Sequence, residues 1–273
     1  MKAVVDVGSN SILLTVAKKS QDGYVPILET SEVTALGEGL DTNGMLKKEA
    51  IERTLASLHA AFAEAQKMGA TVTAYGTMAL RTASNANEFL KRAAEQGTPV
   101  TVISGKQEAR LGLECVLADP LFRDCNQITI VDVGGQSTEI ATSISKQQNS
   151  QENKVDNKIF KWTTVFQKSF QIGTLKLRTN LLSNEVLDSN ALIAAVDSID
   201  RTLVFDSDFI ETGTVVALGA TATNLISIRE GLIEWDATRV HGQWLSFEEI
   251  SRFVAWSSRL TDVERSKITG LEK

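Results

Sequence analysis

The amino-acid sequence predicts an α/β protein that is built from two similar lobes. Three observations support this fold class: a seven-residue motif occurs twice, each copy lies between apolar segments, and a similar series of strands and helices follows each copy. The motif reads V-D-V-G-x-x-S and occupies residues 5–11 and 131–137. Recurrence of a motif together with its surroundings is the signature of a duplicated structural unit. We therefore expect lobes at 1–124 and 125–273, a size that suits two domains.

Each copy of the motif is expected to join two strands. Residues 12–17 continue the first copy as an apolar, β-branched run, and residues 138–144 alternate in the same way after the second copy. Two unrelated strand–turn units are the alternative to a duplication, and the similar flanks disfavour it. The Walker loop and the dinucleotide-binding fingerprint both open a helix, so a strand–Gly–strand turn excludes them.

The other elements of the first lobe follow from the spacing of its apolar residues. Apolar residues at helical spacing over 51–65 mark one face of a helix that Gly69 closes. Asn85, with Glu88 three residues later, predicts the N-cap of another helix. The expected elements are a strand near 24–35, a helix over 51–65, a strand over 71–75, a helix from 85 to 97, a strand over 100–103 and a helix over 107–117.

The second lobe is expected to repeat this plan with one insertion. The polar run at 146–154 cannot bury a core, which predicts a loop insertion at about 145–158. The expected elements after this loop are a strand over 159–168, helices over 174–183 and 189–203, a strand over 215–218, a helix from 221 and a final helix over 246–260.

Composition and charge exclude several classes of protein. The net charge of −6 argues against nucleic acid as a partner, because such binding needs clustered Lys and Arg. The two cysteines, Cys115 and Cys125, give no disulfide framework and fit a reducing compartment. The N-terminus lacks the apolar run of a signal peptide, and the sequence holds no 18-residue apolar stretch. We expect a cytoplasmic protein that does not bind membranes.

The two glycine turns suggest phosphate chemistry. A tight strand–Gly–strand turn exposes consecutive backbone N–H groups, which bind phosphate oxygens well. Asp6 and Asp132 precede the glycines, and their carboxylates can hold Mg²⁺ directly or through water. The alternative is that the polar residues only stabilise a hairpin turn through their own backbone. The matched pair of turns favours the phosphate interpretation.

Three further residues have both a functional and a structural interpretation. Gly219 follows a buried strand and opens a helix, and a phosphate or ribose can bind at the N-terminus of such a helix. This segment alone favours the structural interpretation, in which Thr221 or Thr223 is an ordinary N-cap. Glu108 can act as a general base, although acids also favour the first helical turn on electrostatic grounds. The guanidinium of Arg81 can bind phosphate or can simply lie at the surface.

Together these segments resemble the exopolyphosphatase / guanosine pentaphosphate phosphohydrolase (Ppx/GppA) family, within the superfamily of actin-like proteins, sugar kinases and chaperone ATPases. The matching segments occur in the order of the family and span nearly the whole chain. They are residues 5–11, 76–81, 103–111, 132–139, 170–174, 218–224 and 240–242. The resemblance implies two RNase H-like lobes with a cleft between them, and hydrolysis of the terminal phosphoanhydride of polyphosphate or of pppGpp. It also implies Mg²⁺ as cofactor and a homodimer. Polyphosphate or guanosine penta- or tetraphosphate is the implied binding partner.

The resemblance also implies roles for individual residues. Glu108 corresponds to the base that activates the attacking water, and Asp132 and Glu139 to ligands of magnesium or of its water. Gly219 and Thr221 correspond to the nucleotide side of the site. The residues that would hold the phosphates are Ser9, Asn10, Ser11, Arg81, Gly134, Gly135, Gln136 and Ser137.

The sequence departs from the family pattern at several places. Gln136 stands where the family usually has a third glycine, and it would cost about 1 kcal/mol if that position required a positive φ. Gln107 replaces a common Glu, and Ala220 replaces a Gly. Family members continue past the segment at 264–271, so we expect the second lobe to lack a last strand and helix and to expose an apolar strip.

Two other functions are compatible with these residues. A non-catalytic or weakly active protein that binds (p)ppGpp or another nucleotide could carry the same turns. A small-molecule kinase of the same superfamily would need a base in the sugar pocket, for which the sequence offers no candidate.

Overall fold

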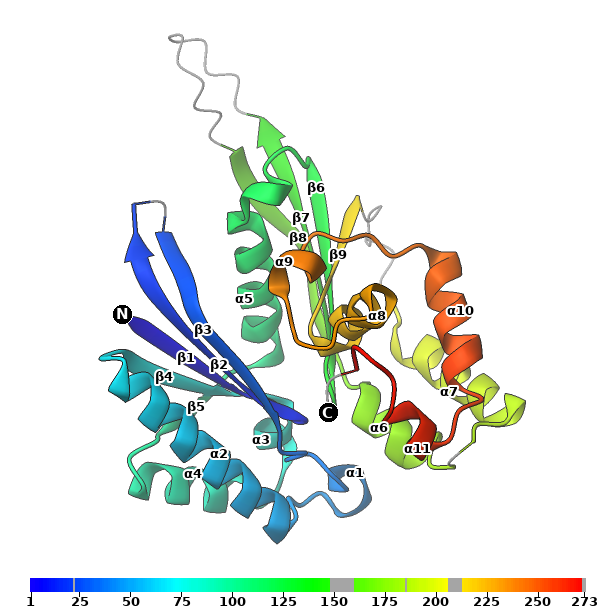
Figure 1. Ribbon diagram of the computed structural model, residues 1–273, viewed down its shortest axis with the longest axis horizontal. Helices are drawn as coiled ribbons and strands as arrows, with labels where there is room; N and C mark the ends of the chain where they lie inside the picture. The colour runs from blue at the N-terminus through cyan, green and yellow to red at the C-terminus, as the bar shows by residue number, and fades with distance from the viewer. Residues whose placement is uncertain (22, 148–159, 185, 206–212, 272–273) are drawn as a thin grey trace. The chain divides into compact units, whose positions relative to one another are not determined.

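The computed structural model describes residues 1–21, 23–147, 160–184, 186–205 and 213–271 of the 273-residue chain (Figure 1). The chain forms two compact units. Unit 1 consists of Met1–Gly105, Gly134–Ser137 and Ile172–Asn180, and unit 2 consists of Lys106–Val133, Thr138–Gln171 and Leu181–Lys273.

The sheet of unit 1 has five strands in the order β3-β2-β1-β4-β5. The first three strands along the chain are antiparallel, and β4 and β5 continue the sheet in parallel with β1. The strands are β1 (Lys2–Val7), β2 (Ser11–Ser20), β3 (Gly23–Val33), β4 (Thr71–Gly76) and β5 (Val100–Val102).

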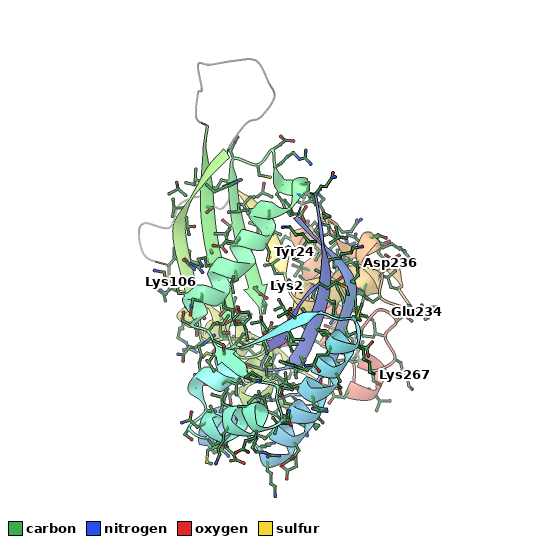
Figure 2. The ribbon with its side chains drawn as sticks, turned by 90° about the vertical axis from the view of Figure 1, so that its left-hand side faces the viewer. Lys2, Tyr24, Lys106, Glu234, Asp236 and Lys267 are labelled. Carbon is green, nitrogen blue, oxygen red and sulfur yellow. The ribbon has the colours of Figure 1, made fainter. Side chains whose placement is uncertain are left out.

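The core of unit 1 lies on one face of this sheet. Alternate residues of β1 and β2, such as Val5 and Leu14, are buried in one core with residues of α2 (Lys48–Lys67) and α4 (Ala86–Glu95). Both helices lie on the same side of the sheet (Figure 1). The opposite face and β3 stay exposed, for example at Tyr24, which is 55% exposed (Figure 2). Unit 1 also contains the short helices α1 (Leu40–Asn43) and α3 (Met78–Thr82), and α6 (Thr174–Asn180).

The sheet of unit 2 has four described strands in the order β8-β7-β6-β9. They are β6 (Gln127–Val133), β7 (Thr138–Gln147), β8 (Phe160–Phe170) and β9 (Thr214–Leu218). Helix α5 (Gly105–Ala118) packs Leu113 and Val116 against Ile128 and Ile130 of β6. The expected lobes at 1–124 and 125–273 differ from the compact units chiefly here, because α5 belongs to the core of the second sheet.

Unit 2 contains further helices. They are the 3₁₀ turn η1 (Pro120–Phe122), α7 (Ser189–Thr202), α8 (Ala220–Glu230), α9 (Ala237–Val240), α10 (Phe247–Ser257) and α11 (Asp262–Arg265). Of these, α8 packs against β6 and β9. Several large apolar side chains of this unit are exposed, among them Phe247 (81%) and Val254 on α10 and Val215 on β9. No helix within the described parts of the chain is long and apolar enough to span a membrane.

The register of the strands confirms the duplicated α/β fold. The first turn joins Val7 to its partner Ile12, and the second joins Val133 to its partner Thr138, so that four residues connect the strands in both cases. Each sheet then adds one strand parallel to its first strand: β4 beside β1 and β9 beside β6.

Three local expectations need correction. Residues 145–147 belong to β7, and the rest of the loop expected at about 145–158 lies outside the described residues. Asn85 occupies the N-cap position of α4 but makes no capping bond, because its side-chain amide pairs with the backbone N–H and C=O of Leu46 (2.8 and 3.0 Å). Neither Thr221 nor Thr223 caps α8, which begins directly after Gly219.

Candidate active site

The two glycine turns have the same geometry. The N–H of Gly8 donates to the carbonyl oxygen of Ser11 (3.0 Å), and the N–H of Gly134 donates to that of Ser137 (2.9 Å). A Cβ atom on Gly8 would lie 2.9 Å from the Ser11 oxygen, and one on Gly134 would lie 3.2 Å from the Ser137 oxygen. Such contacts are tighter than a side chain normally tolerates, so glycine allows both turns to close.

The first turn is held by the segment that follows β3. The N–H of Gly37 donates to the carbonyl oxygen of Ser9 (2.7 Å), and the N–H groups of Thr34 and Ala35 both donate to that of Asn10 (2.9 and 2.8 Å). The hydroxyl of Ser9, which is 5% exposed, accepts a hydrogen bond from the N–H of Ala79 at the start of α3 (3.2 Å). These bonds together fix the shape of the turn's backbone.

Ala35 has a backbone conformation that glycine would adopt more easily. Its φ is 48°, a left-handed value that costs an L-residue roughly 1–2 kcal/mol. Replacing Ala35 with Gly should raise the free energy of unfolding by about 0.5 kcal/mol, because glycine also gains entropy in the unfolded chain and so offsets part of the relief. Urea unfolding measures this change, and a lower midpoint in Ala35→Gly would contradict the strain argument.

The second turn, Gly134–Ser137, belongs to unit 1 because its residues contact other residues of that unit. Its carbonyl oxygens at Gly134 and Gly135 accept hydrogen bonds from the N–H groups of Thr174 (3.0 Å) and Leu175 (2.8 Å) at the start of α6. A Cβ atom on Gly135 would lie 3.3 Å from the Cβ of Asn10 in the first turn. The structure thus places the two turns side by side within unit 1.

The φ of Gln136 is not positive, so this residue does not pay the conformational cost considered above. Among the residues whose structure is described, Ala35 is the non-glycine residue with a positive φ. The side chain of Gln136 is buried (4% exposed), and its Nε2 donates to the carbonyl oxygen of Gly37 (3.0 Å). Sequence reasoning assigned this residue to the phosphates and did not foresee its bond to Gly37.

Arg81 is anchored by the backbone of unit 1. It lies on α3, where its Nη1 donates to the carbonyl oxygen of Ile103 (2.9 Å), and its side chain is half-buried. This bond holds the guanidinium in one place, unlike that of a mobile surface arginine.

In unit 2, the two acids predicted to bind metal lie directly opposite each other. Asp132 of β6 and Glu139 of β7 are cross-strand partners, and they share the sheet face of Ile130 and Ala141 that α5 covers. Glu139 is 2% exposed and accepts a hydrogen bond from the hydroxyl of Ser169 (2.6 Å). Like charges in this arrangement are unfavourable unless a cation or a proton compensates them.

Asp132 is in a confined place. Burial raises the pKa of its carboxyl group above the usual value. A Cβ atom on Gly219, whose φ is 80°, would lie 2.8 Å from Oδ1 of Asp132, so that only glycine leaves this space open. The hydroxyl of Thr221 donates to the carbonyl oxygen of Val133 (2.9 Å) and ties the start of α8 to the end of β6.

Glu108 lies on the face of α5 that is turned toward these acids. A side chain on Gly112 would come within 3.1 Å of Ile130 and 3.3 Å of Leu218, so Gly112 faces the sheet, and Glu108 precedes it by one turn. Because the short segment 119–126 joins α5 to β6, the two elements run in opposite directions (Figure 1). The half-buried Glu108 therefore lies toward the end of β6 that carries Asp132.

The donor set fits Mg²⁺ only in part. Carboxylate oxygens are suitable ligands, and Mg²⁺ in phosphoryl-transfer sites commonly takes one or two carboxylates together with water and substrate phosphates. Within the described parts of the chain, no group of three or more His, Cys, Asp and Glu side chains could hold a metal ion. Asp132 and Glu139 would thus need oxygen ligands from water and substrate.

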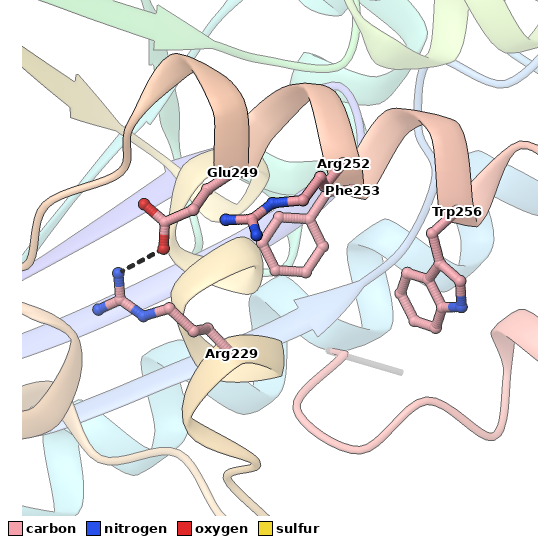
Figure 3. A pocket seen from close by; sticks show the side chains of 5 residues that line it. All are labelled: Arg229, Glu249, Arg252, Phe253 and Trp256. Atoms are coloured by element: carbon pink, nitrogen blue, oxygen red, sulfur yellow. Dashed lines mark hydrogen bonds and ion pairs between the residues drawn. The ribbon is translucent and has the colours of Figure 1, made fainter.

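A surface hollow elsewhere in unit 2 contains none of the predicted site residues. It measures about 260 Å³ and lies between α8 and α10 (Figure 3). Arg229, on its wall, donates to the carbonyl oxygen of Trp244 (2.6 Å) and to Glu249 (3.4 Å), which fixes the two helices to each other. The hollow is lined by Arg229, Glu249, Arg252, Phe253 and Trp256.

Comparison with known proteins gives these residues a context. The chain is 26% identical to the bifunctional 3-dehydroquinate synthase/phosphatase of Fusobacterium nucleatum, over its whole length but only 40% of that relative. It is similar to the crystal structure of a Ppx/GppA family member from Aquifex aeolicus, with 26% identity and a TM-score of 0.72 over 99% of this chain and 83% of that one.

The fold is shared more widely. An exopolyphosphatase from Cytophaga hutchinsonii has the same fold, with a TM-score of 0.81 and 22% identity over 99% of this chain and 83% of that one. Residues 15–273 match the Ppx/GppA phosphatase family. The motifs identified in the sequence, the duplicated fold and this match agree, and the chain belongs to the Ppx/GppA phosphatase family.

Proposed function

We propose that this protein is a phosphoanhydride hydrolase that releases the terminal phosphate of inorganic polyphosphate or of pppGpp with the help of Mg²⁺. The observation that carries the proposal is the matched pair of glycine turns in unit 1. The opposed acids Asp132 and Glu139 of unit 2 support it separately. The family and its exopolyphosphatase structures support a phosphatase, and the chemistry of the turns supports a phosphate chain as the substrate.

Each group has one task in this mechanism. The backbone N–H groups of the turns and the guanidinium of Arg81 bind phosphate oxygens and orient the chain. Glu108 accepts a proton from the attacking water, whose oxygen forms the new bond to phosphorus as the bond to the bridging oxygen breaks. Asp132 and Glu139 would hold Mg²⁺, which when bound neutralises charge on the phosphoryl oxygens.

Phosphate release is the direct test. The purified protein is mixed with polyphosphate or pppGpp, with Mg²⁺ or with EDTA, and free phosphate is measured. The proposal predicts metal-dependent release from at least one of the two substrates. The other candidate is a nucleotide-binding protein without catalysis, which Gln107 favours because it replaces a common Glu beside Glu108 and removes one negative charge. It predicts binding of (p)ppGpp and no release.

Glu108→Gln should lower kcat by about 10²–10⁴-fold, because an amide cannot accept the proton of the attacking water. Binding of the phosphate chain should change little, since the glycine turns are left intact. The matched control is Glu114→Gln on the same helix, where the exposed carboxylate pairs with Arg110 (3.5 Å). Unchanged phosphate release by Glu108→Gln would remove Glu108 from the role of base.

A further inference from the structure

Gln136 is a turn residue whose side chain points into unit 1. Glutamine in a tight surface turn is usually exposed, but this one is only 4% exposed. Its Nε2 donates to the carbonyl oxygen of Gly37 (3.0 Å), a residue 99 positions away in the sequence. The amide thus connects the second turn to a segment that belongs to the first.

Gly37 is the point where the two turns are joined. Its N–H donates to the carbonyl oxygen of Ser9 in the first turn (2.7 Å), and its carbonyl oxygen accepts from Gln136 of the second. The same carbonyl also accepts from the N–H of Leu40 (3.2 Å), which fills its second lone pair. A Cβ atom on Gly37 would lie 3.1 Å from both the Ser9 Cβ and the Gln136 Cγ.

We propose that Gln136 is a positioning residue, which fixes the two glycine turns relative to each other so that both present their N–H groups to one phosphate chain. This inference rests on the proposed function. A neutral amide suits the task, because it donates to a carbonyl without adding charge beside an anionic substrate. A glycine at this position could not make the bond, and a glutamate could not donate it.

Loss of the bond from Gln136 to Gly37 should affect substrate binding more than the rate of the chemical step. The turns contact the phosphate chain in the ground state and in the transition state alike, so a loss of their alignment weakens both equally. Such a change raises KM and leaves kcat nearly unaltered. A residue that only supported the fold would lower the amount of active protein instead and would not change KM.

The test compares Gln136→Met with Gln96→Met. Methionine keeps the length and volume of glutamine but cannot donate. Gln96, at the C-terminal end of α4, is a matched control in the same unit, because its Nε2 donates to the carbonyl oxygen of Leu55 on α2 (3.1 Å). For Gln136→Met we expect KM to rise by about 3–10-fold, the effect of one hydrogen bond, with kcat within twofold of wild type. Gln96→Met should keep both constants.

A second measurement does not depend on activity. Amide hydrogen exchange, followed by mass spectrometry, should become faster at residues 34–40 and 134–137 in Gln136→Met, and not in Gln96→Met. If wild type hydrolyses neither substrate, the proposed function fails, and exchange alone decides whether Gln136 joins the turns. If Gln136→Met exchanged its amide hydrogens at both segments as slowly as wild type does, the inference would be overturned. An equal rise in KM for the two variants would overturn it as well.

Discussion

The variant Asp132→Asn is expected to lose metal-dependent hydrolysis while becoming more resistant to heat in metal-free buffer. Burial raises the pKa of Asp132, so the folded state disfavours its charged form, and Glu139 faces it across the strand pair. Asparagine removes this charge without changing the size of the side chain. We expect a gain of roughly 2–4 °C in Tm, which corresponds to about 1 kcal/mol in a protein of this length.

The sign of the pH dependence follows from the direction of the pKa shift. Below the pKa that Asp132 has in the unfolded chain, the carboxyl is neutral in both states and costs nothing. The cost of the buried charge appears as the pH rises through the raised pKa of the folded state and is complete above it. The advantage of Asp132→Asn in Tm should therefore be largest at neutral pH and should shrink as the buffer is made acidic.

Activity should change in the opposite direction. Loss of a metal ligand removes several kcal/mol of charge stabilisation, which lowers kcat on the order of 10²–10³-fold. Added Mg²⁺ should raise the Tm of wild type and not that of the variant, since a ligand stabilises only the state that binds it. Asp124→Asn, at an exposed aspartate, is the control. A variant with normal activity, or with a lower Tm in metal-free buffer, would contradict the assignment of Asp132.

Much of the fold could be predicted because its signals are local. The pattern V-D-V-G-x-x-S specifies a strand, a turn and a second strand within a few residues, and both copies form such a hairpin. The sheet against which α5 packs could not be predicted in this way. The apolar residues of α5, such as Leu113 and Val116, would suit either sheet, and only three-dimensional packing selects the second.

The less predictable parts of the site are contacts between distant segments. The bond from Gln136 to Gly37 and the pairing of Asn85 with Leu46 have no local pattern, because their partners are 99 and 39 positions away. The expected threonine cap of α8 was wrong for a local reason: the positive φ of Gly219 lets the helix begin directly after it. The individual roles of site residues came from the family resemblance and remain predictions.

Gly173→Ala is expected to damage stability and activity together. Gly173 lies against the second turn, where a Cβ atom would come 2.6 Å from the carbonyl oxygens of both Gly134 and Gly135. These are backbone atoms, so no rotation of a side chain can relieve the clash. The turn or the start of α6 must move, and the hydrogen bonds from Thr174 and Leu175 to the turn would be strained. Overpacking of this kind costs about 1–3 kcal/mol.

The effect on activity should exceed what the lost stability explains. A displaced turn no longer presents its N–H groups to the phosphates, so KM should rise and kcat/KM should fall, by roughly 10²-fold for a misplacement of about 1 Å. Gly69→Ala separates the two effects: Gly69 has a φ of 72° and open space around it, so alanine there costs about 1 kcal/mol of backbone strain. That variant should have a lower Tm but normal kcat and KM. If Gly173→Ala matched it in all three quantities, the second turn would tolerate displacement, and its N–H groups could not be the ones that align the phosphate chain.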